Sequence, residues 1–102
     1  MLLRIKEHLE EITAICRRYH VKRLELFGSA ARDDFRAGQS DIDFFIEFDS
    51  YSTPDIADRW FGIQEDLQKL LNSEIDLVSA RSAKNPYFLE VANRDRVTLY
   101  AA

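Results

Sequence analysis

The chain has 102 residues, of which 46% are hydrophobic, 31% charged and 12% aromatic, with three glycines and two prolines. This composition is typical of one globular domain over residues 1–102, and it excludes a disordered, collagen-like or multidomain chain. Eighteen acids against fourteen lysines and arginines leave a formal net charge of −4, so we expect no direct binding of DNA, RNA or an anionic membrane.

Residues 2–20 carry an apolar stripe with the spacing of an α-helix. Its members recur every three or four positions and lie on one helical face: Leu2, Ile5, Leu9, Ile12, Cys16 and Tyr19. Coiled coils share this spacing, but the stretch is shorter than three heptads. We therefore predict one helix over 2–20 that packs on a core, with Cys16 inside that core.

The cysteine content and the N-terminus bear on the cellular compartment. A single cysteine cannot form an internal disulfide, so Cys16 fits a reducing environment. Arg4, Lys6 and Glu7 interrupt the apolar start of the chain before a signal-peptide core or a membrane span is long enough. We expect a cytoplasmic protein without membrane contact.

Two strands are predicted in the first half of the chain. Residues 23–27 alternate with period two and stop at Gly28, which predicts a strand that runs into a turn. Residues 41–48 alternate more strongly, and the apolar members share one face: Ile42, Phe44, Ile46 and Phe48. The second strand therefore has one face for the core.

The second half of the chain continues an α+β order. Residues 53–55 supply Thr53 as an N-cap, a first-turn proline and an acid for a helix that ends near 72–73. That helix carries an apolar stripe of Ile56, Trp60, Ile63, Leu67 and Leu70. We predict a third strand over 74–78, a short helix over 86–92 and a last strand over 97–100.

Acidic residues on the predicted strands are the first candidates for chemistry. Asp41 and Asp43 stand at i and i+2, so their side chains project to the same side with Cα atoms about 6 to 7 Å apart. Asp76, between Ile75 and Leu77, joins that face if both apolar pairs pack on the same helices. Three crowded carboxylates repel one another unless cations relieve them, which indicates a site for two Mg²⁺ ions. Each acid alone also fits a solvated strand end.

The turn after the first strand is the second candidate. Gly28 and Ser29 begin a short helical turn, in which free N–H groups and a hydroxyl suit phosphate oxygens and Arg32 adds positive charge. An ordinary turn and helix cap use the same residues. The sequence has neither the lysine of a P-loop nor a G-x-G-x-x-G, which excludes Walker-type ATPases and Rossmann folds.

Together these residues resemble a known family signature. The sequence is similar to the nucleotidyltransferase signature of the DNA polymerase beta superfamily in two segments. The first is Leu26-Phe27-Gly28-Ser29-Ala30-Ala31-Arg32 and the second is Ser40-Asp41-Ile42-Asp43-Phe44, with eleven intervening positions between Ser29 and Asp41. The chain resembles its smallest form, the minimal nucleotidyltransferase (MNT) domain, with 74–78 as the third-aspartate strand. The resemblance implies a small mixed β-sheet with helices packed on one face.

The resemblance also implies roles for residues. Gly28, Ser29 and Arg32 would bind the triphosphate of ATP, while Asp41, Asp43 and Asp76 would bind Mg²⁺ and perform catalysis. It implies transfer of AMP to a hydroxyl of a partner protein, and as partner a HEPN-domain toxin for which this chain is the antitoxin. A second copy of the chain is another partner that would complete the site.

Two other functions stay open at this point. The chain can act as a non-catalytic neutralising or scaffolding subunit of a toxin–antitoxin complex, or as a nucleotidyltransferase for small molecules of the antibiotic-modifying type. The loop also departs from the family pattern, because Asp33 and Asp34 follow Arg32 where the family often has glycine. These acids bear on nucleotide affinity.

Overall fold

The computed structural model describes residues 1–32, 36, 38–79 and 96–102. Its elements follow one another in the order α1 (Leu3–Glu7), α2 (Leu9–Arg18), β1 (Val21–Phe27), the 3₁₀ turn η1 (Gly28–Ala30), β2 (Ile42–Phe48), α3 (Ile56–Leu71), β3 (Ile75–Ser79) and β4 (Val97–Ala101). The four predicted strands are confirmed. The predicted helix over 86–92 and the acids Asp33 and Asp34 lie outside the described residues.

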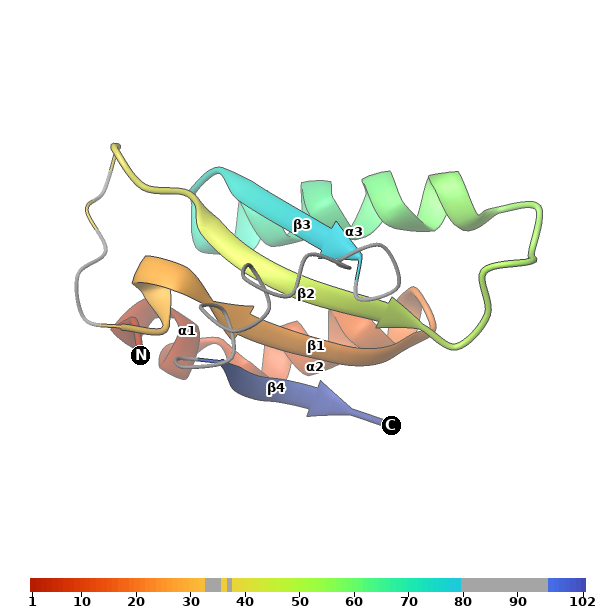
Figure 1. Cartoon of the computed structure of the whole chain (residues 1–102), viewed down its shortest axis with the longest axis horizontal. Helices are drawn as coiled ribbons and strands as arrows, with labels where there is room; N and C mark the ends of the chain where they lie inside the picture. The colour runs from red at the N-terminus through yellow and green to blue at the C-terminus, as the bar shows by residue number, and fades with distance from the viewer. Residues whose placement is uncertain (33–35, 37, 80–95) are drawn as a thin grey trace, which may run out of the picture.

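The strands form one mixed sheet in the order β3-β2-β1-β4. β1 pairs antiparallel with both β2 and β4, whereas β2 and β3 pair in parallel. A parallel pair needs a long crossover, and α3 provides it between β2 and β3. Figure 1 shows α1, α2 and α3 behind the sheet, so the predicted arrangement with helices on one face is confirmed for the described residues.

The core lies between the sheet and the helices. The four apolar residues predicted for one face of the second strand are at most 2% exposed: Ile42, Phe44, Ile46 and Phe48. Cys16 from α2 and Ile63 and Leu67 from α3 are fully buried against them. Cys16 is therefore a core residue, as predicted, and its burial raises the pKa of the thiol to about 12.

The N-terminal helix differs from its prediction, because it is broken in two at His8 (φ −118°, ψ 22°). Three tertiary hydrogen bonds, from Leu2 and Arg4, fix the direction of the short α1. The Leu2 N–H donates to the Ala30 carbonyl at 2.8 Å, and Arg4 donates to the Leu71 carbonyl and to Ser73. After the break the stripe is rotated, so that Leu9 is exposed and Ile15 is buried. The apolar spacing continues across His8, and no local signal marks the break.

The start of α3 also differs from its prediction. Asp55, not Thr53, occupies the cap position, and no side chain caps the helix. The Thr53 hydroxyl instead accepts a hydrogen bond from Arg59 at 3.1 Å. The end is close to the predicted position, with Asn72 in a left-handed conformation (φ 49°, ψ 46°), although Leu71 rather than Leu70 is the fully buried residue of the last turn.

Arg59 of α3 is the main buried charge of the fold and was not singled out in the sequence. It is 6% exposed and its guanidinium lies 4.7 Å from the centre of the Phe48 ring. It donates five hydrogen bonds, to the carbonyls of Tyr19, His20 and Ser50, to the Thr53 hydroxyl and to an Asp49 carboxylate oxygen. Arg59 therefore ties the loop after β2 and the turn before β1 to one helix.

Candidate active site

The register of β2 and β3 brings two of the predicted acids side by side. Asp43 pairs with Asp76, and Phe27 at the end of β1 pairs with Asp43 from the other side. Their strand neighbours Ile42 and Ile75 are buried toward the helices, so Asp43 and Asp76 project from the opposite face of the sheet. Asp41 stands just before β2 and is exposed. The predicted sharing of one face by Asp43 and Asp76 is confirmed.

The pKa of Asp43 is shifted by the neighbouring carboxylates. Its carboxyl is half-buried, and its pKa is raised from 3.8 to about 6, first by burial and then by the negative charges of Asp76 and Asp41. A hydrogen bond with Asp76 raises the pKa as well, while the Arg32 guanidinium lowers it. Asp41, Asp76 and Arg32 are therefore all close enough to act on one carboxyl.

The turn after β1 packs directly against Asp43. Gly28 has φ +73°, which favours glycine, and a Cβ added there would lie 2.4 Å from the Asp43 Oδ2 atom. The turn closes when the N–H groups of Ala31 and Arg32 both donate to the Gly28 carbonyl at 3.1 Å. Ser29 follows in the same turn and is half-buried. Gly28 and Arg32 thus border Asp43 from the β1 side, and Ser29 lies between them in the same turn.

The donor set suits a hard divalent cation. Carboxylate oxygens are the ligands that Mg²⁺ prefers, and a cation would relieve the repulsion at Asp43. In the part of the chain that the structure describes, no three acidic, histidine or cysteine side chains enclose an ion site as they stand. The arrangement is a close pair, Asp43 and Asp76, with Asp41 as an exposed neighbour. The cation site over all three acids stays a prediction.

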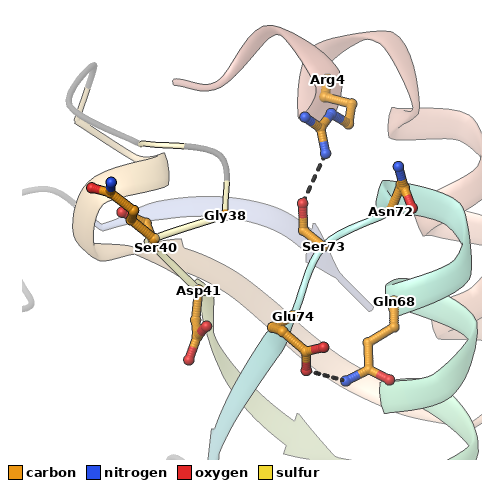
Figure 2. A pocket seen from close by; sticks show the side chains of 9 residues that line it. Arg4, Gly38, Ser40, Asp41, Gln68, Asn72, Ser73 and Glu74 are labelled. Carbon is orange, nitrogen blue, oxygen red and sulfur yellow. Dashed lines mark hydrogen bonds between the residues drawn. The ribbon is translucent and has the colours of Figure 1, made fainter.

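A polar cavity of about 510 Å³ opens beside Asp41 (Figure 2). Its walls come from α1, the segment before β2, the end of α3 and the segment before β3: Arg4, Gly38, Gln39, Ser40, Asp41, Gln68, Asn72, Ser73 and Glu74. Apart from Asp41, none of these was a site candidate in the sequence. Arg4 is far from the others along the chain, and only tertiary folding reveals that it belongs with them.

The face that carries Asp43 also holds an aromatic pair. Phe27 and Phe45 are 7% and 2% exposed, and their ring centres are 4.3 Å apart in a stacked arrangement. Glu25 beside them accepts a hydrogen bond from Thr98 at 3.1 Å and forms a 3.2 Å ion pair with Arg96. These contacts fix β4 on β1. Phe45 is therefore buried, although it lies on the same face of the sheet as Asp43.

Comparison with known proteins identifies the family. A family model described as a nucleotidyltransferase domain matches residues 9–99, a range that includes both the turn at Gly28 and the three aspartates. The chain belongs to this nucleotidyltransferase family. The nucleotidyltransferase activity predicted from the Gly28-Ser29 and Asp-x-Asp signature is therefore confirmed at the level of the enzyme class.

Two relatives of this nucleotidyltransferase come from Methanocaldococcus jannaschii. The protein named "Putative protein adenylyltransferase MJ1379" is 35% identical over 97 residues, which cover 94% of this chain and 95% of that protein. "Putative protein adenylyltransferase MJ0128" is 38% identical over 80 residues, which cover 78% of each chain.

Solved structures share the fold. A "putative minimal nucleotidyltransferase" matches with a TM-score of 0.75 and 28% identity over 95% of both chains. A toxin–antitoxin complex with AMP-PNP matches with a TM-score of 0.69 and 21% identity, over 92% of this chain and 73% of that one. A tri-AMPylated Shewanella oneidensis HEPN toxin in complex with MNT antitoxin matches with a TM-score of 0.64 and 19% identity, over 95% of this chain and 72% of that one. The last two support the fold alone, and the minimal nucleotidyltransferase architecture is confirmed.

Proposed function

We propose that this nucleotidyltransferase transfers AMP from ATP to a hydroxyl side chain of a partner protein, with Mg²⁺ as cofactor. The observation that carries this proposal is the packing of Gly28 against Asp43, which in turn pairs with Asp76. A phosphate-binding turn next to a carboxylate pair has a chemical use when a triphosphate and its metal ions lie across both.

The residues of the site bind different parts of the donor nucleotide and its metal ions. Gly28, Ser29 and Arg32 bind the triphosphate from the β1 side, and Asp41, Asp43 and Asp76 bind the metal ions. Bound Mg²⁺ would supply positive charge for the pyrophosphate leaving group and lower the pKa of the acceptor hydroxyl. The hydroxyl oxygen forms a bond to the α-phosphorus, the bond to the β-phosphate oxygen breaks, and Asp76 takes up the hydroxyl proton.

A HEPN-domain toxin is the partner that the relatives support best. Two relatives are named as protein adenylyltransferases, and the same fold occurs in complexes of HEPN toxins with MNT antitoxins. The described part of this chain holds little beyond the sheet, its helices and the acidic site. We infer that the toxin itself presents the acceptor hydroxyl and that this chain is its antitoxin.

Transfer of AMP tests the proposal. The protein is incubated with ATP, Mg²⁺ and the HEPN protein of its genome, and intact-mass spectrometry follows the partner. We expect a gain of AMP that Asp43→Asn abolishes, whereas Asp58→Asn, which removes an exposed acid in the first turn of α3, leaves it unchanged. Binding and neutralisation of the partner without any transfer would show a non-catalytic subunit instead.

A further inference from the structure

We propose that the cavity beside Asp41 binds the nucleoside part of the donor nucleotide, and that Gln68 and Glu74 recognise the edge of its base. This inference rests on the proposed function, because it takes the α-phosphate to lie over the acidic pair.

The position of the cavity relative to the strands favours the nucleoside. The turn at Gly28 borders Asp43 from the β1 side, so the pyrophosphate portion extends toward β1. Asp76 lies on β3, and the acceptor approaches from there, opposite the leaving group. The third direction runs from Asp41 round the end of the sheet, past the starts of β2 and β3, toward α1 and the end of α3. The cavity opens in that direction between Ser40 and Glu74, and Asp41 lies where it meets the acidic face (Figure 2).

The charge of the lining argues against a polyphosphate in this cavity. Asp41 and Glu74 contribute two carboxylates, and both are exposed. Arg4 is the one cation among the described lining residues, and it already donates to the Leu71 carbonyl and, at 2.8 Å, to the Ser73 hydroxyl. A neutral ligand with many hydrogen-bonding groups fits this lining better than an anion does. A nucleoside is such a ligand.

Gln68 and Glu74 offer a matched donor and acceptor at the cavity wall. The Gln68 Nε2 atom lies 3.5 Å from a Glu74 carboxylate oxygen, a long contact that a ligand can replace. Adenine presents an amino donor next to a ring nitrogen acceptor, which suits a carboxylate and an amide N–H respectively. Hypoxanthine has a carbonyl oxygen in place of that amino group. This oxygen and the Glu74 carboxylate are both hydrogen-bond acceptors and would repel each other.

Binding of three ligands tests the assignment. ATP, inosine triphosphate and inorganic tripolyphosphate, each with Mg²⁺, are titrated calorimetrically into the parent protein and into Gln68→Ala and Glu74→Gln. We expect both variants to bind ATP about tenfold more weakly than the parent, which is the lower range for the loss of a bidentate base contact. Their affinity for tripolyphosphate should be unchanged. The parent should prefer ATP to inosine triphosphate, and Glu74→Gln should reduce that preference.

Controls separate this inference from the proposed function. Glu65→Gln removes an exposed carboxylate of α3 whose partner is Lys69 at 2.9 Å, and it should bind all three ligands as the parent does. If both cavity variants bind ATP as tightly as the parent while Asp43→Asn still weakens it, the nucleoside lies elsewhere and only this inference fails. If the parent binds neither ATP nor tripolyphosphate, the proposed function fails with it.

Discussion

The two ends of β2 treat their carboxylates in opposite ways. After the strand, Asp49 accepts a hydrogen bond from the buried Arg59 at 3.1 Å, within a network that satisfies five acceptors. At its start, Asp43 is half-buried between other carboxylates, and its pKa rises to about 6. At this end the pKa of Asp43 stays raised although the Arg32 guanidinium lowers it, and such crowding of carboxylates is typical of a site that binds a ligand.

Removal of Arg59 should have the largest effect on stability. Arg59→Ala deletes a buried charge and leaves the Tyr19 and Ser50 carbonyls without this donor, while the His20 carbonyl keeps only the Asp49 N–H at 3.1 Å. We therefore expect a loss of about 3 to 5 kcal/mol in the free energy of unfolding. Urea unfolding measures it, with Arg17→Ala on the exposed face of α2 as the control. A loss below about 1 kcal/mol would show that the network is not what holds this end of the sheet.

Gly28 offers a matched pair of glycine substitutions. Gly28 and Gly38 both have positive φ, +73° and +80°, but an added Cβ meets the Asp43 carboxylate only at Gly28 and nothing within 4 Å at Gly38. We expect Gly38→Ala to cost about 1 kcal/mol for the backbone alone and Gly28→Ala about 2 to 3 kcal/mol. Equal costs in thermal unfolding would mean that Asp43 moves aside freely and that the turn does not depend on close packing.

The pH dependence of stability should differ between Asp43 and Asp49, which lie at the two ends of β2. Because the folded pKa of Asp43 lies above its ordinary 3.8, its contribution to stability is present at low pH and is lost as pH rises through about 6. Asp43→Asn should therefore become more stable relative to the parent between pH 4 and pH 8, by about 1 kcal/mol after allowance for solvent screening.

Urea unfolding in a chelator measures this difference, and Mg²⁺ added at pH 8 should stabilise the parent more than the variant. The comparison Asp49→Asn should show no such gain at high pH, because its carboxylate has a cationic partner. A parent whose stability relative to Asp43→Asn is the same at both pH values would contradict the repulsion that we assign to the acidic end.

The sequence predicts the acidic end of β2 better than the other end. Period-two alternation fixes the face of Ile42 and Phe44 and therefore that of Asp43, and a short turn at Gly28 follows from its glycine. The Arg59 network and the Arg4 wall of the cavity depend on contacts between helices and carbonyl groups that are distant in the sequence. The spacing of apolar residues along the chain does not predict such contacts. The same holds for the break at His8, which tertiary contacts of Leu2 and Arg4 impose.

Calorimetric titration of Mg²⁺ with ATP tests the central claim, that the crowded acids of β2 and β3 bind the metal and its nucleotide. We predict binding by the parent protein that Asp43→Asn weakens strongly, while Asp58→Asn, on the exposed surface of α3, has the affinity of the parent. Equal affinity in the parent and in Asp43→Asn would contradict the account.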